Sequence, residues 1–126
     1  MSIAALNFLN QRMEEALPGH CAFMRWNTHP PDDYYFTYEY SEIPVLNAEE
    51  DGRREMSVFI RGYTWKDWMT LEQAKENIQR KVPTTAILED GSGIAIFYDA
   101  ASVVPTGLDE LKSIKIDMTI QEWRAV

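Results

Sequence analysis

Apolar residues recur along this chain with two different periods, one typical of helices and one typical of strands. Between residues 2 and 17 they recur every three or four positions: Ile3, Leu6, Leu9, Met13 and Leu17. This period predicts a helix with one buried face. Ser2 can cap its first turn, and Pro18 with Gly19 can end it.

A second helical pattern occupies residues 64–82. Its apolar face is formed by Trp68, Leu71, Ala74 or Lys75, Ile78 and Val82. Thr70 with Gln73 fits a capping box at the start of this helix, and Pro83 can end it. We therefore expect Thr70 to be the N-cap and Trp68 to lie in the core.

Strands are expected elsewhere, and alternation of apolar and polar residues is the signal for those at residues 34–43, 55–64 and 113–123. The strands are expected at residues 20–27, 34–43, 55–64 and 113–123, with two more in residues 84–101 around the turn sequence EDGSG. In residues 34–43 the side chains on one face are Tyr34, Phe36, Tyr38 and Tyr40. In residues 113–123 the inward side chains are Ile114, Ile116, Met118 and Ile120. Residues 102–111 are expected to form an irregular connection.

These elements follow one another in the order α-β-β-β-α-β-β-β. The order predicts an α+β fold, a mainly antiparallel sheet of five to six strands with two helices packed on it. Because the chain has 126 residues, we expect a single α+β domain covering residues 1–126.

The charge of the chain narrows the possible partners. The net charge is −8, and residues 32–55 contribute −6 of it, from eight acids and two bases. Binding to nucleic acid through phosphates needs a basic patch, which this sequence does not offer. No run of about 18 apolar residues predicts a membrane helix, and the N-terminal residues lack the features of a signal peptide. The single cysteine, Cys21, excludes a disulfide within the chain.

Candidate chemistry is sparse. His20, Cys21 and His29 match no metal-binding motif, and Cys21 has no sequence feature that places a base beside it. The paired carboxylates lie beside proline or glycine in predicted turns, where they stay solvated. We therefore expect no enzyme activity, no cofactor and no metal site. The tyrosine stripe of residues 34–43 either lines a ligand pocket or packs under the helices.

Two features predict contacts with protein subunits instead. The stretch NAEEDGRREM, residues 47–56, places a long polar tip between two predicted strands, with charges of both signs on Glu49, Glu50, Asp51, Arg53 and Arg54. At the corner before the second helix, Tyr63 and Trp65 are of the residue types that anchor interfaces. We predict that these seven residues form a subunit interface.

The order of elements and three stretches also resemble a known family. The stretches are VFIRGYTWKD, TLEQAKENIQRKV and the closing EWR. They resemble the tail terminator proteins of long-tailed bacteriophages, also called tail completion or minor tail proteins. The resemblance implies a homo-oligomeric ring, expected to be a hexamer, that caps the tail tube at the head–tail joint. It implies the tail tube and the head–tail connector as partners, and no membrane or specific nucleic-acid binding. It also implies assembly in the host cytoplasm, then a place in the virion tail.

Physical arguments fit a ring of this kind. A ring needs two different surfaces that meet head to tail, and an acidic lumen would repel DNA phosphates. We hypothesise that the acidic side lines the lumen or faces the tube, and that Arg53 and Arg54 pair with a neighbouring subunit. Two alternatives stay open. One is a ligand-binding or enzyme domain with an aromatic-lined pocket, and the other is an acidic regulatory adaptor.

Overall fold

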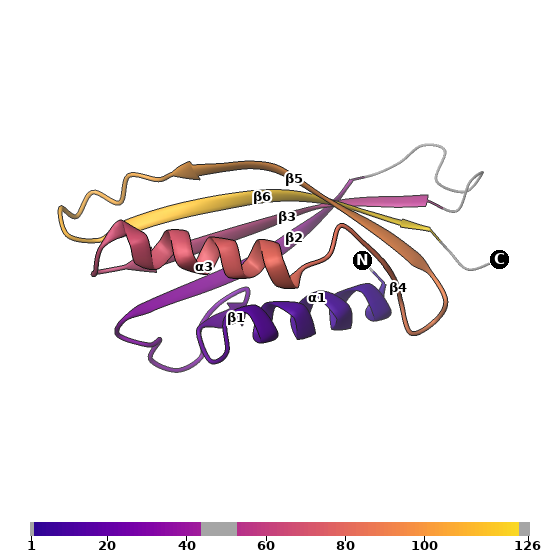
Figure 1. The fold of residues 1–126 in the computed structure, drawn as a ribbon, viewed down its shortest axis with the longest axis horizontal. Coiled ribbons are helices and arrows are strands. Elements are labelled where there is room, and N and C mark those ends of the chain that lie inside the picture. The colour runs from indigo at the N-terminus through magenta and orange to yellow at the C-terminus, as the bar shows by residue number, and fades with distance from the viewer. Residues whose placement is uncertain (1, 44–52, 124–126) are drawn as a thin grey trace.

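A six-stranded sheet carries two helices on one of its faces (Figure 1). The computed structural model describes residues 2–43 and 53–123. The helices are α1 (Ile3–Ala16) and α3 (Trp68–Lys81). The strands are β1 (Cys21–Phe23), β2 (Tyr34–Ile43), β3 (Arg53–Thr64), β4 (Thr85–Ile87), β5 (Gly93–Val103) and β6 (Lys112–Trp123). Their order across the sheet is β1-β2-β3-β6-β5-β4. The predicted α+β class and element order are confirmed.

The pairing is antiparallel except between β1 and β2. Long β3 and β6 pair along their whole lengths, from Arg53 opposite Trp123 to Thr64 opposite Lys112. Because β3 begins at Arg53, this residue belongs to a strand, and the predicted start of that strand at residue 55 was too late. β5 likewise continues to Val103, into the connection that was expected to be irregular.

The first predicted strand, residues 20–27, is much shorter than expected. β1 ends at Phe23 because Met24 adopts a positive φ of 69°, which no regular strand accommodates. The chain then leaves the sheet, so β1 covers only the Phe36–Tyr38 part of β2.

Helix α1 packs on the sheet, but its buried face differs from the prediction at one end. Leu9, Met13 and Leu17 are buried as expected, whereas Ile3 is 80% exposed. Ile3 lies about 240° around the helix from Leu9, at about 100° per residue, so it points away from the core. Ala5 takes the inward position in that turn and is 2% exposed.

Helix α3 begins differently from the prediction. Asp67 is the N-cap, and its side chain accepts a hydrogen bond from the Thr70 amide at 3.2 Å. Thr70 is therefore inside the helix, and the predicted capping box is wrong. Trp68, the first helical residue, lies at the rim of the core and is 40% exposed, so its predicted burial is also wrong. Neither helix in the described residues is long and apolar enough to cross a membrane.

The core between sheet and helices is apolar and closely packed. Inward positions of β6 are filled as predicted by Ile114, Ile116, Met118 and Ile120. The ring of Phe36 is fully buried and lies over Gly62, its cross-strand neighbour. A methyl group on Gly62 would come within 2.4 Å of this ring, so the ring occupies the space of the missing side chain.

A buried carboxylate lies at the end of this core where α1 begins. Glu122, at the end of β6, is only 4% exposed. It accepts a hydrogen bond from the hydroxyl of Ser2, and that hydroxyl in turn accepts one from the amide of Ala5 at 3.1 Å. Ser2 is therefore the N-cap of α1, as predicted, and also fastens the helix to β6.

Candidate interaction surfaces

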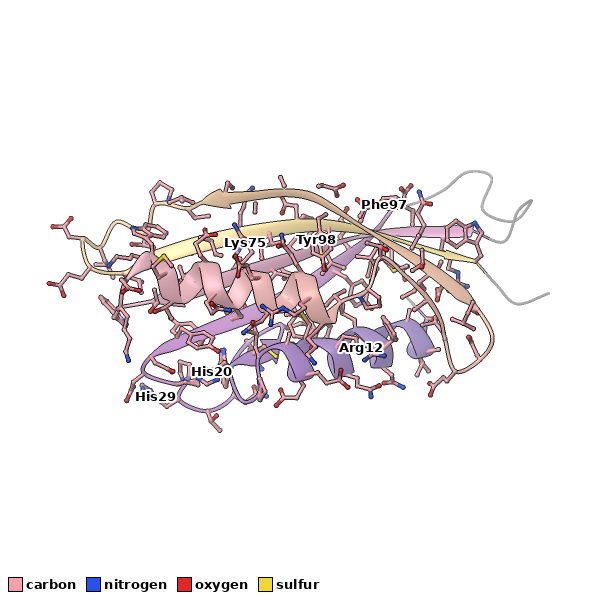
Figure 2. All side chains as sticks on the ribbon, viewed as in Figure 1. Arg12, His20, His29, Lys75, Phe97 and Tyr98 are labelled. Atoms are coloured by element: carbon pink, nitrogen blue, oxygen red, sulfur yellow. The ribbon has the colours of Figure 1, made fainter. Side chains whose placement is uncertain are left out.

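Each histidine lies beside one aspartate, His20 beside Asp33 and His29 beside Asp32, in two separate contacts. Nε2 of His20 lies 3.0 Å from a carboxylate oxygen of Asp33, and Nδ1 lies 2.9 Å from the carbonyl oxygen of Pro18. The His20 ring also stacks on Tyr34 at 4.1 Å between centroids. Figure 2 shows both His20 and His29 at the end of the molecule where the chain connects β1 to β2. No group of three potential metal ligands occurs in the described residues.

Cys21 does not have the surroundings of a reactive nucleophile. Burial, then the negative charge of Glu14 and a hydrogen bond to its carboxylate, raise the pKa of the Cys21 thiol to about 12. The Sγ atom lies 3.8 Å from Glu14, so the nearest polar partner is an acid. A thiol in this setting stays protonated at neutral pH and is inert.

The tyrosine stripe of β2 is mainly core. Phe36 and Tyr38 are buried, and the Tyr38 hydroxyl donates to the side-chain oxygen of Asn10 on α1 at 2.7 Å. Tyr34 and Tyr40 pack against the same cluster at its edges. Two hollows, of about 80 and 160 Å³, lie beside the helices, and neither is lined by the stripe. Neither of these two hollows is the aromatic-lined pocket that the sequence left open.

The structure describes four of the seven predicted interface residues, and these four lie in two separate places. Glu49, Glu50 and Asp51 lie outside the described residues. Arg53 and Arg54 lie in β3, at the end of the sheet where β6 finishes. Tyr63 and Trp65 lie near the other end of β3. The four described residues thus lie at opposite ends of the sheet, two at each end.

Arg54 has a neighbour that the sequence did not reveal. It pairs across the ladder with Glu122, so both side chains belong to the helix-bearing side of the sheet. Arg54 is exposed, while Glu122 is buried. A basic residue at position 54 therefore places positive charge beside a buried carboxylate.

Tyr63 belongs to an aromatic group on the face of the sheet that carries no helix. It stacks on Tyr35 at 5.2 Å, and Tyr35 meets Trp26 edge to face at 6.5 Å. Trp65 lies just beyond β3, in the corner that leads to α3, and is 52% exposed. Met69, in the first turn of α3, is 72% exposed. This end of the molecule thus presents unusually exposed apolar side chains.

The helix-free face, which we call the open face, mixes aromatic and charged side chains. Its aromatic residues include two that the sequence analysis did not propose for contact, Phe59 at 37% and Phe97 at 48% exposure. The alternation of β3 did place Phe59 opposite the core face, so this signal was present in the sequence. The described charged side chains of the open face include four acids and two bases: Glu39, Glu55, Asp99, Asp117, Arg61 and Lys115.

Comparison with known proteins shows similarity in fold. No protein-family model matches the sequence, and no curated protein matches it. Among 24 matching solved chains is one in the virion of a native gene transfer agent particle. The TM-score is 0.69 with 9% identity, over 97% of this chain and 98% of that chain. A second, whose designation names no function, has a TM-score of 0.60 and 11% identity over 96% and 97% of the two chains. The chain therefore has the fold of a component of a gene transfer agent virion, along nearly the whole length of both chains.

Proposed function

We propose that this protein is a structural component of a phage-like particle, and specifically a tail terminator that forms a ring on the end of the tail tube. The observation that carries the proposal is the fold shared with a chain of a gene transfer agent virion, over 97% and 98% of the two chains. The sequence resemblance to tail terminators points to the same class. Six copies per ring, and contacts with the tail tube and the head–tail connector, are the finer parts of the proposal.

The chemistry of the surface supports an assembly role. Cys21 is held as an inert thiol, and the tyrosine stripe is used for packing. What the surface offers instead are exposed aromatic side chains and charges of both signs, which are typical of protein contacts. Acidic residues outnumber basic ones among the described side chains of the open face, which is compatible with a lumen that does not bind DNA phosphates.

Native mass spectrometry over a concentration series tests the proposal. We expect a single closed species of six copies that persists on dilution, because each subunit in a ring is held by two neighbours. A chain that stays monomeric at every concentration contradicts the ring. A stable dimer that retains a small molecule would favour the ligand-binding alternative. A monomer that binds a basic protein would favour the adaptor.

The predicted role of Arg53 and Arg54 needs a variant that spares the fold. Reversing the charge at Arg54 would place a carboxylate opposite buried Glu122 and would destabilise the subunit itself. We therefore choose Arg53→Gln with Arg54→Lys, which keeps a positive charge beside Glu122. The double variant should weaken assembly while its circular dichroism melting curve stays close to wild type. If assembly is unchanged, these arginines do not bind the neighbouring subunit.

A further inference from the structure

Three large apolar side chains are exposed at the corner that leads from β3 into α3. Trp65 is 52% exposed, Trp68 40% and Met69 72%. Beside Trp65, the side chain of Lys66 is exposed and forms no ion pair with any described residue. We call these four residues the corner patch. An exposed apolar patch that is bordered by polar groups marks a surface that another molecule covers.

A hollow lies at the other end of the molecule, between α1 and β4. It measures about 160 Å³, and its walls include Phe8 and Arg12 of α1 and Ile87, Leu88 and Glu89 at the end of β4. The side chain of Ile87 is 77% exposed, so one apolar wall is uncovered. A cavity of about 150 Å³ with apolar walls holds a benzene ring. This hollow, which we call the α1–β4 groove, is therefore large enough for one aromatic side chain.

Arg12 makes the groove suitable for an aromatic partner. Its guanidinium lies over the ring of Phe8, 5.1 Å from the centroid, and its Nη1 lies 2.9 Å from a carboxylate oxygen of Glu15. The Arg12 side chain nevertheless stays 36% exposed. Because guanidinium groups stack on aromatic faces, a second ring can pack on Arg12 from the solvent side.

The free charges of the two surfaces have opposite signs. Glu89 lines the α1–β4 groove, is exposed, and forms no ion pair with any described residue. Lys66 is its counterpart in the corner patch. By contrast, Phe59 of the open face lies between two acids, because its cross-strand neighbours are Glu39 and Asp117. Charge therefore favours the corner patch over Phe59 as the occupant of the groove.

The two surfaces of one copy are too far apart to meet. β3 ends at Thr64, opposite Lys112 at the start of β6, and the corner patch follows directly. β4 is level with Glu122 near the end of β6, because both pair with Ile94. At about 3.3 Å per residue, these two levels of β6 are about 33 Å apart. Figure 1 shows the start of α3 at one end of the molecule and β4 with α1 at the other. A contact between the two surfaces therefore joins two copies.

We propose that the corner patch of one copy binds the α1–β4 groove of the next copy, with Trp65 in the hollow and Lys66 beside Glu89. The inference rests on the proposed ring and names its subunit contact. Because the two surfaces differ and lie at opposite ends of the subunit, the contact is head to tail. Contacts of this kind generate a ring when the rotation closes.

An exchange of charges tests the contact. Lys66→Glu and Glu89→Lys each place two like charges opposite one another, so each should raise the concentration needed for assembly at least about tenfold. The double variant, Lys66→Glu with Glu89→Lys, restores opposite charges and should assemble close to the wild-type concentration. Both positions are exposed and form no ion pair with described residues, so all three variants should melt close to wild type.

Glu76→Lys is the matched control for Glu89→Lys. Glu76 is an exposed residue of α3 outside both surfaces, and it forms no ion pair with any described residue. The two substitutions change the net charge by the same amount. We expect Glu76→Lys to assemble at the wild-type concentration. An equal loss of assembly in both variants would show that net charge controls assembly, which contradicts the proposed contact.

A mixing experiment tests the direction of the contact. Trp65→Ala removes the aromatic side chain of the corner patch, and Ile87→Lys places a positive charge in the groove where Lys66 would lie. Alone, each variant should stay monomeric in native mass spectra at concentrations at which the wild type assembles. An equimolar mixture should give 1:1 dimers and nothing larger, because only one intact patch meets one intact groove. Circular dichroism melting curves verify that both variants are folded.

Each outcome separates the inference from the ring itself. If the wild type forms rings and both Lys66→Glu and Glu89→Lys form them equally well, the proposed contact is wrong while the ring stands. If the double variant assembles no better than the single variants, Lys66 and Glu89 do not meet. A mixture that stays monomeric, or that assembles into rings, contradicts the head-to-tail pairing. A wild type that never assembles overturns the ring and this inference together.

Discussion

The contact between Phe36 and Gly62 gives a sharp test of the packing. In Gly62→Ala the new methyl group would lie 2.4 Å from two ring carbons of Phe36 and 2.8 Å from a third. Carbon atoms in contact normally lie about 3.5–4.0 Å apart. The ring must therefore move by about 1 Å, and it is fully buried, so its neighbours must move too.

The expected cost follows from two opposing terms. Overpacking a core typically costs about 1–3 kcal/mol. Replacing glycine by alanine returns about 0.4–1 kcal/mol, because the unfolded chain loses freedom. The free energy of unfolding should therefore fall by about 1–2 kcal/mol. For a chain of this size that corresponds to a melting temperature about 4–8 °C lower.

Urea unfolding followed by circular dichroism measures the change. Gly93→Ala is the matched control, since a methyl group there meets no atom within 4 Å, and it should be neutral or slightly stabilising. In a Phe36→Leu background, Gly62→Ala should cost at least about 1 kcal/mol less than in wild type. If Gly62→Ala melts at or above the wild-type temperature, the close contact is not there and the reasoning fails.

Three further predictions concern single groups. Ser2→Ala removes the cap of α1 and leaves Glu122 without the Ser2 hydroxyl, so urea unfolding should show a loss of about 1–3 kcal/mol, while Ser2→Thr stays close to wild type. Iodoacetamide at pH 8 should label Cys21 at least about a hundredfold more slowly in the folded than in the urea-unfolded chain, because its folded pKa is about 12; equal rates would contradict this. Opposing effects act on the pKa of the Asp33 carboxyl group. Slight desolvation raises it, while the hydrogen bond from the Tyr34 amide and the charge and hydrogen bond of His20 lower it, and the net shift is downward. The Asp33 carboxylate therefore stabilises the fold at pH values above its pKa in the unfolded chain. This stabilisation is lost as the pH falls through its lower pKa in the folded chain. Between about pH 4 and pH 2, Asp33→Asn should lose less stability than wild type in urea titrations, and equal losses would refute the pairing.

Sequence periodicity predicted the architecture well where the pattern was long. The alternation of β6 gave its buried residues Ile114, Ile116, Met118 and Ile120, because a strand with one covered face has little choice of register. The helix of residues 3–16 was equally clear. The helical period did not predict burial at the ends of the helices. Ile3 and Trp68 are apolar residues in the first turns of α1 and α3, where the sheet covers the helix only in part, so both are exposed.

The surfaces were less predictable, because they depend on contacts between distant parts of the chain. Nothing in the local sequence indicates that Arg54 lies opposite Glu122, or that Glu122 meets Ser2, 120 positions away. That Trp65 and Ile87 lie at opposite ends of the sheet follows only from the way β3, β4 and β5 pair. The sequence alone could identify the residues suited to contact, but only the strand order shows which of them share an end of the sheet.

The central claim is that copies of this chain close into a ring, and electron microscopy of the assembled wild-type protein tests it most directly. Class averages of the purified oligomer should show a ring with a central hole and six-fold rotational symmetry. Compact particles without a hole, open filaments, or fields of single subunits at concentrations well above those of a stable assembly would contradict it.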